Sequence, residues 1–162
     1  MKHLTKRLFA VIAAVIALSG CQNYEDISMA LGADVNTAEV LSETDSHGGF
    51  HGDGERYMEF QFEGNEFENV IKKDNTWHSL PIKEDTVTAV FYGLEKDGIV
   101  YGPYIDAEIP KVEEGYYFIY DRHSDSTEPF DSAEILERGS FNFTAAIYDV
   151  NTDRLYYVEV DT

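Results

Sequence analysis

Two histidines and two aspartates lie in one glycine-rich stretch, D-S-H-G-G-F-H-G-D-G, which runs from residue 45 to residue 54. Imidazole nitrogens and carboxylate oxygens bind Zn²⁺, Mn²⁺ and other divalent ions in proteins. We therefore take Asp45, His47, His51 and Asp53 as a candidate metal site, on which a metal-dependent hydrolase would depend. The same stretch is also typical of a polar turn, because Asp and Gly favour turn conformations. A Ca²⁺ site fits less well, because the D-x-D-x-D-G spacing is absent and histidine is a poor Ca²⁺ ligand.

A β-hairpin centred on Gly49 would bring these side chains together. In that register three polar pairs face one another, namely His47–His51, Asp45–Asp53 and Glu43–Glu55. Residues two apart share a strand face, so all six would point the same way, and Val40, Ser42, Met58 and Phe60 would occupy the core face. A shift of one residue would reverse the faces of a strand, so this register is a hypothesis.

A second polar loop, D-R-H-S-D-S, spans residues 121–126 and follows an aromatic segment. Arg122 could recognise an anion, and His123 could join His47 and His51 if the two loops meet at one end of the sheet. Ser, His and Asp are all present, but a catalytic triad is a spatial arrangement and not a local run. The chain also lacks the G-x-S-x-G nucleophile motif, so a polar loop with capping side chains is the alternative interpretation.

The elements that must position these loops are mainly strands. Segments in which apolar residues alternate with others, or in which aromatic and β-branched residues gather, predict strands over residues 57–62, 87–92, 116–120, 141–147 and 155–160. The last two are separated by the turn-like segment 149–153 and should form an antiparallel hairpin. Helices are expected over residues 24–31, closed by Gly32, and over residues 65–73 and 131–138. Together these elements predict an α+β fold, a single domain with a mostly antiparallel sheet and two or three short helices.

The first residues have the features of an export signal. Lys2, Lys6 and Arg7 precede an apolar run over residues 8–18, which is too short to span a bilayer but suits a signal peptide. The sequence L-S-G-C that follows resembles the lipobox of bacterial lipoproteins. The resemblance implies that residues 1–20 are removed and that Cys21 carries the lipid. Residues 21–35 would then be a short N-terminal segment, followed by one globular domain over residues 36–162.

The composition limits the classes of partner. Cys21 is the only cysteine, so no disulfide can stabilise the domain. Without residues 1–20 the chain has nine basic and 31 acidic residues, a net charge of −22. Such a charge argues against nucleic acid, whose binding requires neutralisation of phosphates, and favours a cation or a basic partner.

Three stretches, H-G-G-F-H-G-D-G-E, G-Y-Y-F-I-Y-D-R-H-S and S-F-N-F-T-A-A-I-Y-D, are similar to a group of small exported proteins and lipoproteins of Gram-positive bacteria. The resemblance implies export and lipidation, but it carries over no reaction, ligand or catalytic residue. The sequence thus predicts a lipid-anchored, extracytoplasmic binding module at the cell membrane rather than an enzyme. Its ligand would be a cell-envelope protein, a glycan or a cation. Exposed tyrosines could offer flat surfaces for a glycan or protein, although paired aromatics in strands more often divide between core and rim; the candidates are Tyr92, Tyr101, Tyr104, Tyr116, Tyr117, Tyr156 and Tyr157.

Overall fold

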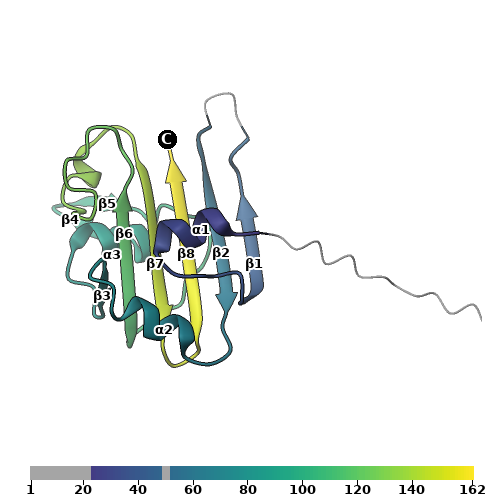
Figure 1. Ribbon diagram of the computed structural model, residues 1–162. Coiled ribbons are helices and arrows are strands. Elements are labelled where there is room, and N and C mark those ends of the chain that lie inside the picture. The colour runs from purple at the N-terminus through teal and green to yellow at the C-terminus, as the bar shows by residue number, and fades with distance from the viewer. Residues whose placement is uncertain (1–22, 49–51) are drawn as a thin grey trace, which may run out of the picture.

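A computed structural model describes residues 23–48 and 52–162 of this chain. Six antiparallel strands form one sheet in the order β1-β2-β8-β7-β6-β3 (Figure 1). They are β1 Glu39–Asp45, β2 Gly54–Gln61, β3 Trp77–Ser79, β6 Gly115–Asp121, β7 Asn142–Asp149 and β8 Arg154–Asp161. A separate two-stranded sheet consists of β4 Leu94–Lys96 and β5 Ile99–Tyr101. The predicted α+β fold with a mostly antiparallel sheet is confirmed.

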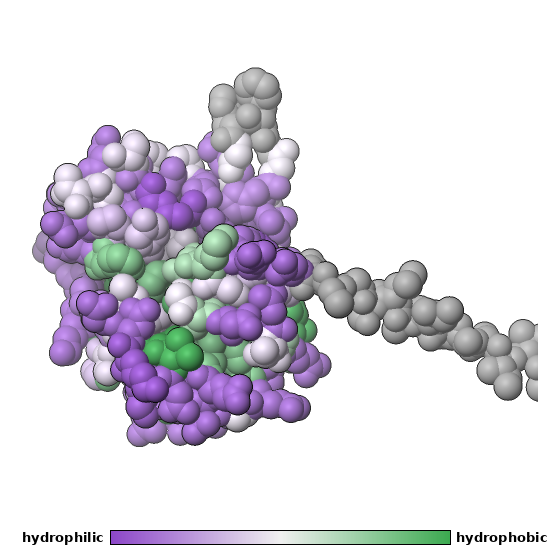
Figure 2. Space-filling model, viewed as in Figure 1, coloured by the Kyte–Doolittle hydropathy of each residue, from purple (hydrophilic) through white to green (hydrophobic). Residues whose placement is uncertain are grey.

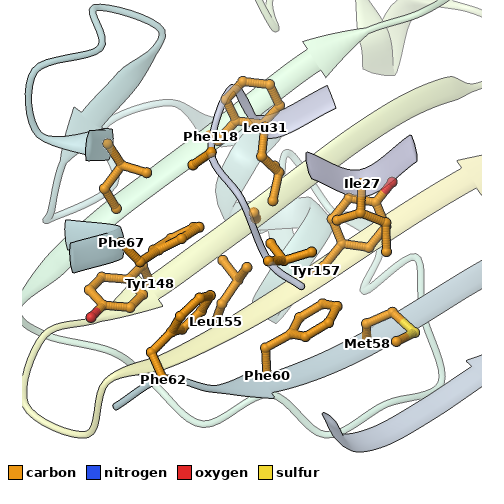
Figure 3. Packing of buried hydrophobic residues seen from close by; sticks show 14 of the residues in the cluster. Ile27, Leu31, Met58, Phe60, Phe62, Phe67, Phe118, Tyr148, Leu155 and Tyr157 are labelled. Atoms are coloured by element: carbon orange, nitrogen blue, oxygen red, sulfur yellow. The ribbon is translucent and has the colours of Figure 1, made fainter. Parts of the chain in front are cut away.

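One face of the sheet is covered by two short helices, α1 (Glu25–Leu31) and α2 (Glu66–Ile71). Figure 3 shows Ile27 and Leu31 of α1 and Phe67 of α2 packed against aromatic and aliphatic side chains of the central strands. Helix α1 ends at Gly32, whose φ of 68° is left-handed and therefore suits glycine. Trp77 also packs in this core, and its indole N–H donates to the Leu31 carbonyl at 3.1 Å.

The opposite face is covered by a third helix, α3 (Asp85–Tyr92), together with the loops that follow it. The sequence predicted a strand over residues 87–92, and that prediction is wrong. Val87, Val90 and Phe91 stand at offsets 0, 3 and 4, which is helical spacing, and all three are buried against this face. This short apolar run fits both the helical period and the strand period. Packing against the sheet stabilises the helix.

The helix expected over residues 131–138 is reduced to a single 3-10 turn, η1 (Ile135–Glu137). The side chain of Asp131 accepts a hydrogen bond from the Ala133 N–H, which favours a turn at this point. Arg138 is extended and forms an ion pair with the buried Asp121 at the end of β6. This long-range pair draws the chain away from the helical path that its local sequence favours.

The hairpin of β7 and β8 is confirmed, with Asn142 opposite Asp161 and Asp149 opposite Arg154. Strand β8 lies between β2 and β7, so its charged end at Asp161 adjoins the strand that leads out of the histidine-rich loop. The order of strands therefore brings residues from β1, β2, β6 and β8 to the same end of the sheet.

Candidate functional site

The β1–β2 hairpin contains the histidine-rich stretch, and its register differs from the predicted one. Glu43 pairs with Met58 and Asp45 pairs with Arg56, so each partner lies three residues beyond the expected one. The register shifts between Val40 and Ser42, where an extra residue forms an irregularity in β1.

This shift changes which side chains can meet. Asp45 lies opposite Arg56, whereas Glu55 is the next residue along β2 and therefore faces the other side of the sheet. The prediction that all six polar side chains share one face is wrong for Asp45 and Glu55. An odd shift has this effect because side chains alternate between faces with a period of two.

His47 is held between two carboxylates from different strands. Its Nδ1 lies 2.8 Å from Oδ1 of Asp45, and its Nε2 lies 3.2 Å from Oδ2 of Asp161. The contact between Nε2 and Asp161 is short enough for an ion pair but is not a hydrogen bond. Nε2 of His47 is buried and has no hydrogen-bond partner. Burial raises the pKa of Asp45, but hydrogen bonds from the backbone and ring of His47 outweigh it and leave that pKa below its ordinary value.

The backbone of His47 also packs against Gly54 at the start of β2. A Cβ at Gly54 would lie 2.6 Å from the His47 nitrogen and 2.7 Å from its Cα. This close approach requires glycine at position 54. It also fixes the point of the hairpin from which the imidazole of His47 projects.

Arg122 meets the same carboxylate from the other side. Its Nη2 lies 3.0 Å from Oδ1 of Asp161 and 3.1 Å from Oε1 of Glu159. Asp161 therefore contacts both His47 and Arg122, although no sequence pattern predicted a role for Asp161. His123 points elsewhere, with its Nε2 3.2 Å from the hydroxyl of Ser140.

Arg56 extends this arrangement toward α1. It pairs with Glu159 in the β2–β8 register, and its Nη1 lies 2.7 Å from Oδ2 of Asp26. We call the set His47, Arg56, Arg122, Glu159 and Asp161 the charged tract. It occupies the end of the α1-bearing face that lies beyond the apolar core.

The charged tract is partly buried and internally paired. Its side chains are between 16% and 28% exposed, and its imidazole and both of its guanidinium groups lie within 3.2 Å of a carboxylate. Two further buried nitrogens, Nε of Arg56 and Nε of Arg122, have no hydrogen-bond partner. Removing one charge would leave its neighbours uncompensated, so the tract ties β1, β2, β6 and β8 together.

The part of the chain that the structure describes provides no complete set of ligands for the predicted metal site. Among residues 23–48 and 52–162, no group of three or more His, Cys, Asp or Glu side chains is placed to hold a metal ion. Asp53 is exposed, and His51 lies outside the described residues. His47 and Asp45 do lie together, and Asp45 contacts the imidazole Nδ1, so Nε2 is the ring nitrogen that could bind a metal ion.

A hollow of about 320 Å³ lies beside the β1–β2 hairpin and contains Glu55. Its other polar lining residues are Thr44, Asp45, Ser46 and Asp106. Burial raises the pKa of Glu55, and the negative charge of Asp106 raises it further. The hollow therefore disfavours an anion.

The seven tyrosines considered as a binding platform are not exposed. Three of them, Tyr117, Tyr156 and Tyr157, are buried in the two cores. The other four are half-buried; they are Tyr92, Tyr101, Tyr104 and Tyr116. Aromatic side chains in this protein therefore contribute mainly to packing.

Exposed apolar side chains occur instead on the small β4–β5 hairpin. Ile99 is 54% exposed and Val100 is 72% exposed. Asp97 and Gly98 form the two-residue turn, with φ values of 54° and 77°, as a type I′ turn requires. The dipeptide Asp-Gly between short apolar segments is a recognised hairpin signal, and it could have located this element from sequence.

No helix within the described residues is long and apolar enough to cross a bilayer. Comparison with family models, with curated proteins and with solved structures finds no match to this chain.

Proposed function

We propose that this chain is a lipoprotein, anchored through Cys21 to the outer face of the cell membrane, and that it acts there as a binding module rather than an enzyme. The observation that carries the first part is the sequence L-S-G-C behind a basic and then apolar N-terminus. A Cys-linked lipid with two or three acyl chains would hold the domain firmly, because each buried methylene adds about 0.8 kcal/mol.

The short distance between the anchor and the fold supports a domain that stays close to the membrane. Only three residues separate Cys21 from Glu25, where α1 begins. An extended chain covers at most about 3.6 Å per residue, so the start of α1 would lie within about 14 Å of the lipidated residue.

Binding is favoured over catalysis because the charged tract already satisfies its own charges. His47 lies between Asp45 and Asp161, and the Ser46 hydroxyl donates to the Glu55 carbonyl at 3.2 Å rather than to an imidazole. A nucleophilic serine would need a hydrogen bond to its general base. No such pair involving His47 is formed in the described part of the hairpin.

Lipidation can be tested in cells that make the full chain and receive an alkyne-tagged fatty acid. We expect the label on the wild-type protein and on Ser19→Ala, because a small residue at that position preserves the lipobox pattern. Cys21→Ser should lose both the label and membrane association. An unlabelled wild-type protein would contradict the proposal.

A second candidate function is binding of a divalent ion such as Zn²⁺ or Mn²⁺. The position of His47 favours it, because Asp45 holds the imidazole Nδ1 as carboxylates do in many metal sites, while Nε2 is directed toward Asp161. Elemental analysis of the purified mature lipoprotein tests it. Stoichiometric metal that is lost in His47→Ala but retained in His123→Ala would support the site, and metal-free protein would exclude it.

A further inference from the structure

The β4–β5 hairpin, α3 and η1 enclose a groove of about 550 Å³. Its apolar lining includes Leu94, Ile99, Tyr101 and Leu136, all of them at least partly exposed. Val100 stands between Ile99 and Tyr101 on β5, so its side chain points to the other side of the strand, away from the groove. Apolar side chains gathered around a groove with a polar rim are typical of a surface that binds another molecule.

The rim of this groove is acidic. Two lysines, Lys83 and Lys96, stand among five carboxylates, namely Glu84, Asp85, Asp97, Asp131 and Glu137. Lys96 is paired with Asp85 at 2.6 Å, so its charge is locally matched. The groove therefore keeps an excess of three negative charges, which favours a positively charged occupant.

The position of the hairpin suits a partner rather than the membrane. Helix α1 starts beside β1 and β2, where Asp26 pairs with Arg56 and Tyr24 donates to Glu43. Figure 1 places β4 and β5 at the opposite edge of the molecule from that start. A lipid at Cys21 would consequently hold the groove away from the attachment point.

We propose that this groove binds a cationic amphipathic segment of another protein, extended so that apolar and basic side chains alternate. The apolar side chains would cover Leu94, Ile99 and Leu136, and the Lys or Arg side chains would reach the carboxylates of the rim. This inference rests on the proposed function as a binding module. A second copy of the chain is disfavoured, because two acidic grooves would repel each other.

The test uses the mature lipoprotein in nanodiscs of neutral phosphatidylcholine, with empty nanodiscs as a blank. The probe is a fluorescent peptide of alternating lysine and leucine, and its control is a peptide of alternating lysine and serine. We expect the leucine peptide to bind the wild type and the variant Ile99→Ser to raise its Kd at least about tenfold. The serine peptide should bind more weakly and be insensitive to this variant.

A matched control variant is Met29→Ser on α1, because Met29, like Ile99, is a large apolar side chain that is more than half exposed, at 73% against 54%. Met29 lies on the other face, which in Figure 2 carries apolar surface around α1 within a hydrophilic rim. Unchanged binding by Met29→Ser supports the groove. Equal losses in both variants, or no loss in Ile99→Ser, would overturn it.

Two further measurements separate the remaining interpretations. Light scattering of the lipoprotein in nanodiscs should give one chain per disc at low loading. Pairing that Ile99→Ser abolishes would identify a second copy as the occupant and overturn the proposal. Lipidation is measured independently with the fatty-acid label. Failure of the peptide to bind a correctly lipidated protein would therefore refute the groove while leaving the anchor intact.

Discussion

The two hairpins β1–β2 and β4–β5 differ in whether their side chains are paired with other residues or left exposed to solvent. The first carries many polar side chains, and its His47 is bound on both sides by carboxylates. The second is only three residues long in each strand, yet it leaves Ile99 and Val100 exposed. The density of polar residues in the sequence thus marks an internally paired cluster, whereas the more available binding surface is a short segment that looks ordinary.

The comparison predicts that the first hairpin matters more for stability. Asp161→Ala should lower the free energy of unfolding by about 2 kcal/mol, because it deprives both His47 and Arg122 of a carboxylate. Asp161 is 23% exposed, so solvent offsets part of the larger loss expected for a fully buried pair. Urea denaturation measures the change, with the exposed Asp53→Ala as the control, which should alter stability by less than about 0.5 kcal/mol. A loss no larger than that of the control would mean that the charged tract does not hold the strands.

A smaller effect is expected in the turn of the second hairpin. Gly98 has a φ of 77°, and a Cβ there would meet nothing within 4 Å, so Gly98→Ala is strained by its backbone alone. The cost should be about 1 kcal/mol. Hydrogen exchange should accelerate in β4 and β5 and leave the six-stranded sheet unchanged. Gly48→Ala, at a position with open space and no left-handed φ, should have little effect. Faster exchange throughout the large sheet would contradict the view that the small hairpin is a separate unit.

The smallest effect concerns the pH dependence contributed by Glu55. Burial and the charge of Asp106 raise its pKa in the folded state, so the folded protein binds this proton more tightly than the unfolded chain does. Stability must then fall as the pH rises from the ordinary glutamate pKa through the raised value. Glu55→Gln should remove that decline and gain less than about 1 kcal/mol at neutral pH. Thermal unfolding across the acidic range measures it, and a decline as steep as that of the wild type would disprove the assignment.

Much of the sheet could be predicted because its strands alternate clearly. The segments 116–120 and 155–160 lie within observed strands, and the segments 57–62 and 141–147 each extend one residue beyond an observed strand. The short helix that is closed by Gly32 is also present. Residues 87–92 were mistaken because Val87, Val90 and Phe91 suit a helix as well as a strand. In such short apolar runs, the surface available for packing decides between the two.

The candidate site was less predictable, for two physical reasons. The extra residue between Val40 and Ser42 shifts the register of β1 against β2, and no local sequence pattern predicts that shift. The residue that joins His47 to Arg122 is Asp161, which is far from both in the sequence and reaches them only through the strand order. The sequence shows which residues can form hydrogen bonds and ion pairs, but it does not show which residues pair with one another.

The sequence by itself determined the strongly acidic net charge of −19, the alternation that forms the strands, and the L-S-G-C motif from which we infer a lipid anchor. These are local or additive properties, so they need no knowledge of the fold. Only the tertiary structure decided that His47 is enclosed by Asp45 and Asp161, and that Ile99 and Val100 remain exposed. Pairing and exposure depend on which distant strands become neighbours, and that follows from packing of the whole chain.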